Sequence, residues 1–483
     1  MYIGVDLGTS SVKVSLVTAE GQIVASNTQE YPLYSPHPGF SEQRPEDWLD
    51  KTLLALKALS ELTSLSDVRA MSFSGQMHGL VCLDEADNVI RPAILWNDQR
   101  TQKETDYLNQ VVGVKKLVEY TANRAVTGFT APKILWVKNN EPQNFERIAK
   151  IMLPKDYLAY MLTGTFATDV SDAGGTLLFD VKNRAWSKQM LEIVGLPESA
   201  LPKVYESSCV IGTVKEKFCR LTGLNENVKV VIGGGDQAVG AVGTGTVGEG
   251  GASISLGTSG VIFVASETFK EDKEGLLHNF CHADGRYHFM GVTLSAAASY
   301  GWITDLLGVD VASLESEVAA APIDDVVFTP YLTGERSPIN APTVKGSFYG
   351  LTAQTKRANL ARAVMEGVAF SLKDCLSVMN SVGIKPKKAR VIGGGSRSKA
   401  WVQILADVLD LEICKINTSD GGALGAAILA MVGDGVYACV DDACKAIVKD
   451  VESVLPDRER AEKYRKKFEI YKKLQEFSLK LIK

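Results

Sequence analysis

The sequence predicts an α/β protein with two large domains, and three observations lead to that prediction. A chain of 483 residues exceeds one hydrophobic core, because single cores stop growing near ~250–300 residues. Strand-like segments alternate with helix-like segments along most of the chain. The segment "LGTSSVKVSLV", from Leu7, recurs as "LGTSGVIFVAS", from Leu256. A repeat at half the chain length indicates two similar domains, which we place at 1–247 and 248–483.

The repeated segment predicts a β-hairpin in each half. The first 33 residues read as three strands with turns at "GT" and "EGQ", since β-branched residues alternate with polar ones. Residues 252–266 predict the same hairpin in the second half. The two halves therefore share their first structural elements.

Strand-then-helix units follow the hairpins. In the first half we expect a strand and a polar loop in 68–79, a helix from about Thr101, and a strand, glycine loop and helix in 227–245. In the second half the same order is expected in 286–308, 387–410 and 411–433. The last segment, 457–483, predicts an amphipathic helix packed against the protein body.

Composition excludes several classes of function. A net charge of −5 and a pI near 5.8 argue against a general nucleic-acid binder. No apolar run reaches ~18 residues, so no membrane partner is expected, and "MYIGVDLGTS" reads as a strand and lacks the features of a signal peptide. The eight cysteines form no CxxC pair and are expected to be reduced. These features predict a cytoplasmic protein with small-molecule partners, and a homodimer stays open.

Two turns of one design suit a polyphosphate. "DLGTSSVK" begins at Asp6, and its Gly-Thr-Ser turn directs backbone N–H groups and hydroxyls at one point. "SLGTSG", from Ser255, repeats the turn without the acid. A pair of such turns can hold phosphate oxygens, with the Asp6 carboxylate placed to hold Mg²⁺. The chain has no GxxxxGK[ST] and opens on no GxGxxG, so it matches neither a P-loop protein nor a typical dinucleotide-binding fold.

Two glycine loops differ in charge at one position. "VIGGGDQAVG" carries Asp236 behind three glycines, and "VIGGGSRSKA" has Ser396 at that place. Asp236 is also a suitable helix cap, but a cap alone does not need three glycines. We expect the helix N-terminus to keep Asp236 ionised, so that it accepts a proton from a hydroxyl attacking phosphorus. Ser396 avoids setting a carboxylate beside a nucleotide.

Two longer segments carry a family resemblance. "GFTAPKILWVKNN" (128–140) and "GSFYGLTAQTKRANLARAVME" (346–366) resemble the signatures of the FGGY carbohydrate kinases. The resemblance covers essentially the whole chain. It implies the two-domain actin/hexokinase/Hsp70-like (ribonuclease H-like) α/β fold with a cleft between domains. The first domain would bind sugar and carry the catalytic base, and the second would bind nucleotide.

Within that family, further segments are similar to the members that phosphorylate D-xylulose. They include "PHPGFSEQRPEDW" (36–48), "GQMHG" (75–79), "RPAILWNDQR" (91–100), "GGGDQAVGAVG" (233–243) and "PYLTGERSP" (330–338). The implied activity is transfer of the γ-phosphoryl group of ATP to the 5-hydroxyl of D-xylulose, giving D-xylulose 5-phosphate and ADP in xylose catabolism, with ATP and Mg²⁺ required. Two departures concern Ser11, where relatives often have Gly, and Gln237, where many have Asn.

The resemblance implies roles for individual residues. Asp236 would be the general base and Asp6 the acid beside the transferred group, and both would hold the metal. The sugar would contact Met77, His78, Trp96, Asn97, Asp98 and Gln237. ATP would contact Thr9, Ser10 and Lys13 from the first domain and Thr258, Ser259, Gly394, Gly395 and Ser396 from the second. Glu335 and Arg336 leave two interpretations open, namely a ligand contact or an ion pair on the domain surface.

Three alternatives remain at the level of sequence. Another FGGY kinase would act on ribulose, fuculose, gluconate or glycerol. A non-catalytic nucleotide-dependent sugar sensor would share the fold, although the acid in "GGGDQ" argues against it. An NAD-dependent dehydrogenase would use the glycine loops for its cofactor, but the repeated Gly-Thr-Ser turns argue against that class. Oligomeric state, the extent of domain closure and regulation are not indicated.

Overall fold

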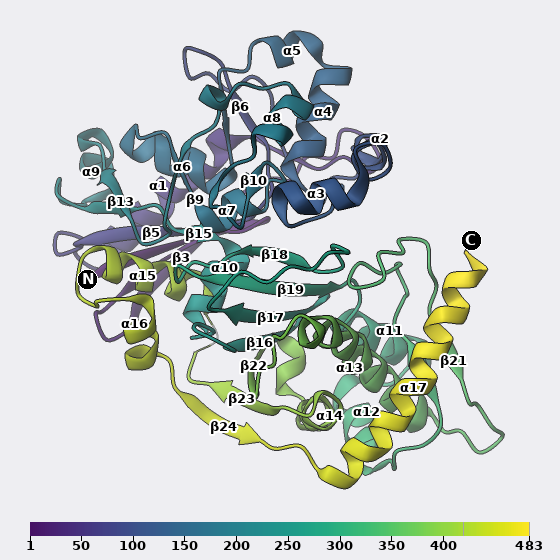
Figure 1. Cartoon of the computed structure of the whole chain (residues 1–483). Coiled ribbons are helices and arrows are strands. Elements are labelled where there is room, and N and C mark those ends of the chain that lie inside the picture. Colours follow the sequence, from purple (N-terminus) through teal and green to yellow (C-terminus); the bar gives the residue numbers. More distant parts are fainter. Residues whose placement is uncertain (419, 483) are drawn as a thin grey trace.

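The computed structural model describes residues 1–418 and 420–482, and its first half contains a seven-stranded mixed sheet (Figure 1). The strand order is β13-β14-β5-β1-β2-β3, with the short β15 also paired to β5. Strand β1 is antiparallel to β2 and parallel to β5. The strands are β1 (Tyr2–Leu7), β2 (Ser11–Val17), β3 (Ile23–Glu30), β5 (Ala70–Gly75), β13 (Val210–Thr213), β14 (Lys229–Val231) and β15 (Gly234–Gly235).

The second half contains a sheet of the same design, with the order β18-β19-β17-β16-β22-β23-β24. Strand β16 is antiparallel to β17 and parallel to β22, as β1 is to β2 and β5. The prediction of two similar α/β halves, each opening on a hairpin, is confirmed. The strands are β16 (Ala252–Leu256), β17 (Gly260–Ser266), β18 (His278–Cys281), β19 (Tyr287–Thr293), β22 (Lys388–Ile392), β23 (Glu412–Ile416) and β24 (Asp450–Val454).

In the described part of the chain, five two-stranded sheets accompany the two large ones. Four of them lie in the first half and one in the second. The pairs are β4 (Glu42–Gln43) with β7 (Ala93–Ile94), β6 (Val81–Leu83) with β8 (Lys150–Met152), β9 (Ala167–Asp169) with β12 (Lys203–Tyr205), β10 (Phe179–Asp180) with β11 (Ala185–Trp186), and β20 (Val327–Thr329) with β21 (Ser347–Tyr349).

Helices cover the first sheet, and further helices lie in the part of the chain between β7 and β12. Helix α1 buries Trp48, Leu56 and Leu59 against the sheet, together with residues of α6 and α9. A separate core that includes Met77 and Phe129 lies among α3, α4 and α8. The helices are α1 (Pro45–Leu62), α2 (Gln102–Tyr107), α3 (Val114–Thr121), α4 (Thr130–Asn140), α5 (Pro142–Glu146), α6 (Pro154–Thr163), α7 (Val170–Gly174), α8 (Lys188–Val194), α9 (Glu216–Thr222) and α10 (Asp236–Gly243).

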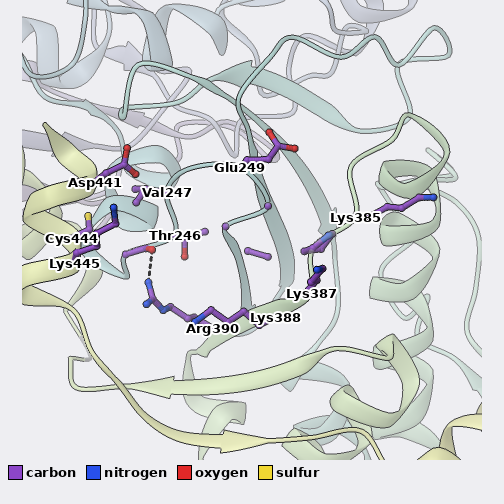
Figure 2. Close-up of a pocket in the computed structure, with 15 residues that line it drawn as sticks. Thr246, Val247, Glu249, Lys385, Lys387, Lys388, Arg390, Asp441, Cys444 and Lys445 are labelled. Atoms are coloured by element: carbon purple, nitrogen blue, oxygen red, sulfur yellow. Dashed lines mark hydrogen bonds between the residues drawn. The ribbon is translucent and has the colours of Figure 1, made fainter.

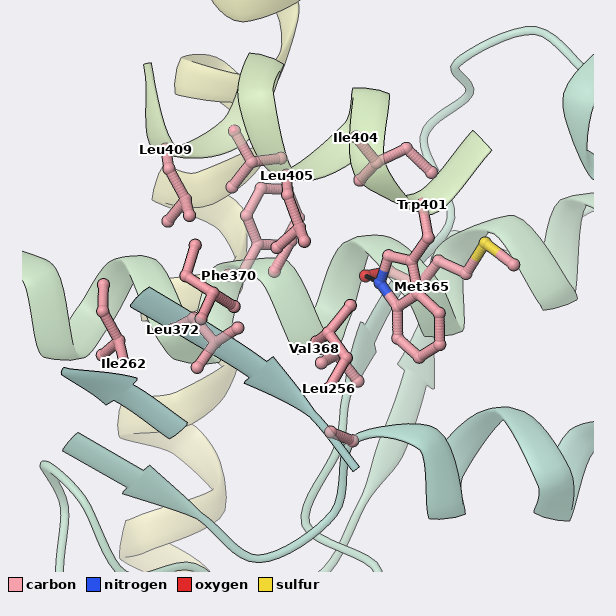
Figure 3. Packing of buried hydrophobic residues seen from close by; sticks show 14 of the residues in the cluster. Leu256, Ile262, Met365, Val368, Phe370, Leu372, Trp401, Ile404, Leu405 and Leu409 are labelled. Carbon is pink, nitrogen blue, oxygen red and sulfur yellow. Dashed lines mark hydrogen bonds between the residues drawn. The ribbon is translucent and has the colours of Figure 1, made fainter. Parts of the chain in front are cut away.

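The second sheet packs against long helices, as Figure 3 shows for Leu256, Met365 and Trp401. The Trp401 indole is buried and donates to the Met365 carbonyl at 3.1 Å. The C-terminal helix buries Tyr464 and Tyr471 in the same core, which confirms that it packs against the body. The helices are α11 (Ala297–Leu307), α12 (Val311–Ala320), α13 (Arg357–Ser381), α14 (Lys399–Leu409), α15 (Gly421–Gly433), α16 (Val440–Ile447) and α17 (Arg458–Leu481).

Helix α15 belongs to the second half of the chain but packs against the first sheet. Its residues Leu424 and Ile428 share a core with Tyr2, Ala70 and Val231, and Figure 1 places the helix directly beneath β5 and β15. It also crosses α10 with almost no side chains between the two backbones. A Cβ on α10 residue 243 would collide with a carbonyl of α15, and a Cβ on residue 425 would collide with a carbonyl of α10. Glycine at both positions therefore sets how closely the two halves meet.

The linker between the halves, residues 244–251, borders a cavity of about 590 Å³ (Figure 2). Arg390 crosses this region and donates to the carbonyl of Thr244 at 2.9 Å. Lys385 and Lys387 line one wall, and Lys445 of α16 lines another. Across the described residues, no helix combines the length and apolar character needed to span a membrane.

Candidate active site

Three strands of the first sheet end at one edge and place two carboxylates there. In the sheet register, Asp6 of β1 lies beside Ser74 of β5, which lies beside Gly234 of β15. Asp236 follows two residues later, at the first position of α10. The Ser74 hydroxyl donates to Asp6 Oδ1 at 2.8 Å. The carboxyl ends of parallel strands are where α/β sheets bind ligands, so this edge is the candidate active site.

The Asp236 carboxylate is held in a desolvated place. Burial raises the pKa of Asp236 to about 7, and the charge of Asp6 acts in the same direction. Hydrogen bonding by Gln237 opposes this shift. The helix N-terminus was expected to keep Asp236 ionised, but burial disfavours the ionised form in the ligand-free protein. A carboxylate with a pKa near 7 is well suited to accept a proton at neutral pH.

The glycine loop before Asp236 is fixed by Ser171 of α7. The Ser171 hydroxyl accepts a hydrogen bond from the Gly235 N–H at 3.1 Å and donates to Asp169 Oδ2 at 2.5 Å. The Ser207 hydroxyl donates to the same Asp169 oxygen at 2.7 Å. All of these serine and aspartate side chains are buried. One hydroxyl thus orients the backbone amide directly ahead of Asp236.

A buried lysine next to this loop meets three aspartates. Lys155 Nζ lies 2.6 Å from Asp156, 3.0 Å from Asp169 and 3.6 Å from Asp172, and all four side chains are fully buried. Burial raises the pKa of Asp172 well above its ordinary value, and neighbouring aspartates add to the shift. Three carboxylates around one ammonium carry excess negative charge in a buried site. Protonation of Asp172 reduces that negative charge.

The Gly-Thr-Ser turn of the first half is tied to the loops predicted to bind sugar. Trp96 Nε1 donates to Thr9 Oγ1 at 2.9 Å, and Gln43 Nε2 donates to the Thr9 carbonyl at 2.6 Å. The Ser10 side chain is exposed. The turn is thus rigid on one side and open on the other, where a phosphate can reach its hydroxyls and amides.

Lys13 and Asp6 each meet the start of α15 from the second half. Lys13 Nζ lies 2.5 Å from Asp420 Oδ2, and Asp420 caps α15 by accepting from the Ala423 N–H. A Cβ on Gly422 would collide with the Asp6 carboxylate. The N-terminus of α15 therefore completes the edge, with Lys13 across from it at the position predicted to face phosphate.

Met77 packs under the glycine loop, and His78 packs against Gly175. A Cβ on Gly235 would lie 2.8 Å from Met77 Cγ, and a Cβ on Gly175 would lie 2.6 Å from the His78 ring. His78 adopts a left-handed φ of 69°, which is uncommon outside glycine. Its Nδ1–H donates to the Gly175 carbonyl at 2.7 Å. Burial lowers the pKa of His78 well below its ordinary value, so the ring is neutral and Nε2 is left as an acceptor.

The unusual backbone of His78 is held by a buried lysine. Lys133 Nζ donates to the His78 carbonyl at 2.7 Å and to the Gly128 carbonyl at 2.6 Å. The Thr130 hydroxyl reaches the same His78 carbonyl at 3.2 Å. Burial lowers the pKa of Lys133 well below its ordinary value. Strain of this kind persists where surrounding contacts fix it, and it gathers at functional sites.

On the loop with Trp96, Asn97 and Asp98, only some of the side chains predicted to bind sugar are accessible. Trp96 is 40% exposed, whereas Asp98 is fully buried and accepts from the Ser41 N–H at 2.6 Å and from Arg100 Nη2 at 2.7 Å. The Asn97 side-chain oxygen is buried and has no hydrogen-bond partner among the residues that the structure describes. The geometry favours Asp98 as a support for this loop, and its contact with sugar stays a prediction.

The predicted nucleotide residues of the second half also lie together. Strand β16 pairs with β22, so the turn with Thr258 and Ser259 lies beside the loop with Ser396. A Cβ on Gly393 would lie 2.7 Å from the Leu256 carbonyl oxygen, so the loop and the strand touch. Thr258 is exposed, and its carbonyl accepts from the first residues at the start of α11. A combined surface for a nucleotide is compatible with this placement and remains a prediction.

Sequence reasoning missed several residues that shape the site. Ser74, Ser171 and Lys133 act through contacts with residues distant in the chain, so no local pattern marked them. Asp420 was detectable, because "SDGGALG" sets an acid before two glycines much as "GGGDQ" sets one after three. Its neighbour Ser419 lies outside the described residues.

Comparison with known proteins supports one family. A model of the amino-terminal domain of the FGGY family of carbohydrate kinases matches residues 1–243, and a model of its carboxy-terminal domain matches residues 252–433. The xylulose kinase of Escherichia coli strain K12 is 43% identical over 489 residues, covering 100% of both chains.

Solved structures agree over the same length. A xylulose kinase from Brucella ovis superposes with a TM-score of 0.94 at 37% identity, covering 99% of each chain. A gluconate kinase from Lactobacillus acidophilus superposes with a TM-score of 0.93 at 26% identity, covering 98% of this chain and 97% of that one. The predicted two-domain α/β fold class is confirmed. With two family models spanning most of its length, the chain belongs to the FGGY family of carbohydrate kinases.

Proposed function

We propose that the protein transfers the γ-phosphoryl group of ATP to the 5-hydroxyl of D-xylulose, giving D-xylulose 5-phosphate and ADP. The observation that carries the proposal is the pair of carboxylates, Asp6 and Asp236, at one edge of a fold similar over its full length to xylulose kinases. The sugar kinase reaction needs a positioned base beside a phosphate site, and this edge supplies both.

Asp236 acts as the general base. It stands at the start of α10 with its backbone oriented through Gly235 and Ser171, so its carboxylate keeps a fixed direction. It accepts the proton of the 5-hydroxyl as that oxygen attacks the γ-phosphorus. In a loose transition state, positioning of the nucleophile contributes more than base strength.

The sugar lies against the first half. The neutral His78 offers Nε2 as an acceptor to a hydroxyl, and the exposed Trp96 offers an aromatic face. Met77, Asn97, Asp98 and Gln237 complete the sugar-binding set that we propose. Closure of the halves around the ligand would exclude water from the reacting atoms.

ATP spans the two halves. Thr9, Ser10 and Lys13 face its phosphates from the first half, and Lys13 is oriented by Asp420. We assign Thr258, Ser259, Gly394, Gly395 and Ser396 to the nucleotide on the second half, and we place the division between domains at 247/248. The eight cysteines are all free, as in reducing compartments, and we place the reaction in the cytoplasm.

Mg²⁺ fits the donor chemistry of this edge. Among the described residues, no group of three or more His, Cys, Asp or Glu side chains is arranged to hold a metal alone. Two carboxylates completed by phosphate oxygens and water are the set that Mg²⁺ prefers, and Asp6 and Asp236 would supply them. When bound, the ion neutralises charge on the phosphoryl oxygens.

A coupled assay of ADP formation with Mg-ATP tests the proposal. D-xylulose should give the highest kcat/KM in a panel with D-ribulose, L-fuculose, D-gluconate and glycerol. A higher value for another member of the panel would reassign the substrate within the family. The absence of ADP formation with every sugar would contradict the kinase activity itself.

A further inference from the structure

A cavity of about 510 Å³ lies between the two halves, beside the residues proposed to bind the sugar. Both halves line it, with Gln99, Arg124 and Thr127 from the first and Leu294, Glu335 and Arg336 from the second. Thr127 directly precedes Gly128, whose carbonyl is held by Lys133 together with that of His78. The cavity therefore adjoins the sugar-binding loops and reaches the second half.

Arg336 brings an unsatisfied charge to this cavity. Within residues 1–418 and 420–482, its guanidinium forms no ion pair and no hydrogen bond. Glu335 does not pair with it, because the Glu335 carboxylate accepts from the Leu294 N–H at 2.9 Å, the Arg336 N–H at 2.8 Å and the Ser371 hydroxyl at 3.2 Å. The ion pair left open by the sequence is not formed. Burial lowers the pKa of the half-buried Arg336, because removing water from the guanidinium disfavours its charged form unless an acceptor replaces that water.

The backbone around Arg336 is fixed, so its side chain is presented from a rigid base. The Ser337 N–H donates to the Val292 carbonyl at 2.9 Å, at the end of β19. The Glu335 carboxylate binds the Leu294 N–H on the other side, as given above. The backbone that carries Arg336 is thus fixed beside the end of β19.

This strand end faces the first-half residues around His78. Strand β18 is paired with β19, and its His278 ring lies 5.5 Å from the Phe129 ring, which lies 4.8 Å from the His78 ring. The charge of Arg336 contributes to lowering the pKa of both histidines. Strand pairing and ring contacts therefore place the end of β19, next to which Arg336 is fixed, close to the residues around His78.

We propose that Arg336 is a substrate-binding residue that contacts the ketose from the second half, at the end of the sugar remote from the phosphorylated hydroxyl. The proposal rests on the proposed function. A guanidinium only donates hydrogen bonds, in a planar fork, and the C2 carbonyl oxygen of a ketose only accepts them. The neighbouring 1-hydroxyl gives the fork its second acceptor. The neutral His78 and the cationic Arg336 would then contact the sugar from opposite halves of the protein.

Steady-state kinetics with D-xylulose and 1-deoxy-D-xylulose test this role. Arg336→Gln should raise KM for D-xylulose about tenfold or more, since charge-assisted bidentate contacts are strong, with less than about twofold change in KM for ATP. Because the 1-deoxy sugar lacks one acceptor, the preference of the parent for D-xylulose should shrink in Arg336→Gln. Arg336→Lys keeps the charge but loses the planar guanidinium. It should restore only part of the preference for D-xylulose over the 1-deoxy sugar.

Arg357→Gln is the matched control. Arg357 is exposed and pairs with Glu317 at the surface, so its removal should leave both sugar constants unchanged. If Arg336→Gln keeps KM for D-xylulose and the discrimination against 1-deoxy-D-xylulose within twofold of the parent, the role of Arg336 is overturned while the kinase activity stands. If the parent forms no ADP with any sugar, the proposed function and this inference both fail.

Discussion

Burial raises the pKa of Asp236, and the negative charge of Asp6 raises it further, because β1, which carries Asp6, and β15, which leads into Asp236, both pair with β5. The ligand-free protein therefore holds together a pair of groups that repel each other. We propose that a bound metal ion or a proton removes that repulsion in the working enzyme. Stability without ligands is reduced in favour of activity at this site.

This repulsion predicts a pH-dependent gain in stability for Asp236→Asn. The pKa of Asp236 is raised from its ordinary value of 3.8 to about 7, so between these values the folded protein binds more protons than the unfolded chain. The contribution of Asp236 to stability consequently falls as pH rises through that window. Without ATP and Mg²⁺, Asp236→Asn should raise the thermal midpoint over the parent at pH 8 and by much less at pH 5. Equal gains at both values would argue against the raised pKa.

Removing the Ser171 hydroxyl should lower kcat through the glycine loop. Ser171→Ala leaves the buried Gly235 N–H without its acceptor, a loss of about 1–3 kcal/mol, and frees the direction of Asp236. We expect kcat to fall about tenfold with KM for sugar near that of the parent. The control is Ser207→Ala, which removes the other hydroxyl on Asp169 and keeps the backbone hydrogen bond from the Gly233 N–H to the carbonyl of residue 207. Equal kcat losses in the two variants would refute a specific role for Ser171.

The crossing of α10 and α15 should not tolerate a methyl group. Gly425→Ala would press a Cβ into the backbone of α10, and overpacking of this kind costs about 1–3 kcal/mol. A lower thermal midpoint is expected. Gly240→Ala, at a half-buried position of α10 with no atom within 4 Å of the added Cβ, should keep or raise the midpoint, since alanine favours helix. A stable Gly425→Ala variant would show that the two helices can separate.

Lys13→Met should weaken ATP binding. Lys13 is oriented by Asp420 beside the Gly-Thr-Ser turn, where its charge would meet phosphate oxygens. We expect KM for ATP to rise about tenfold, as for the loss of a charge-assisted contact, with KM for D-xylulose changed by less than about twofold. Matching increases in both constants would place Lys13 in a general structural role instead.

The fold was largely predictable because its signals are local. The hairpins at 1–33 and 252–266, the strand ahead of Asp236 and the C-terminal helix each follow from alternation, glycine placement or helical periodicity. The repeat from Leu7 to Leu256 then predicted two similar halves. Each of these features can be recognised within a segment of a few tens of residues.

The site was only partly predictable, because its supports join distant segments. Gly235 depends on Ser171, and Asp6 depends on Gly422, more than 400 residues away in the chain. The packing of α15 on the first sheet cannot be read from its own apolar pattern. The ionisation of Asp236 was misjudged, because sequence reveals the helix N-terminus but not the depth of burial.

The most direct test of the account is the single-turnover formation of D-xylulose 5-phosphate from Mg-ATP by the parent and by Asp236→Asn. General base catalysis contributes about 10²–10⁴-fold, so the variant should bind D-xylulose with nearly the affinity of the parent and form product about 10²–10⁴-fold more slowly. A variant that forms product at the rate of the parent would contradict the assignment of Asp236 as the base.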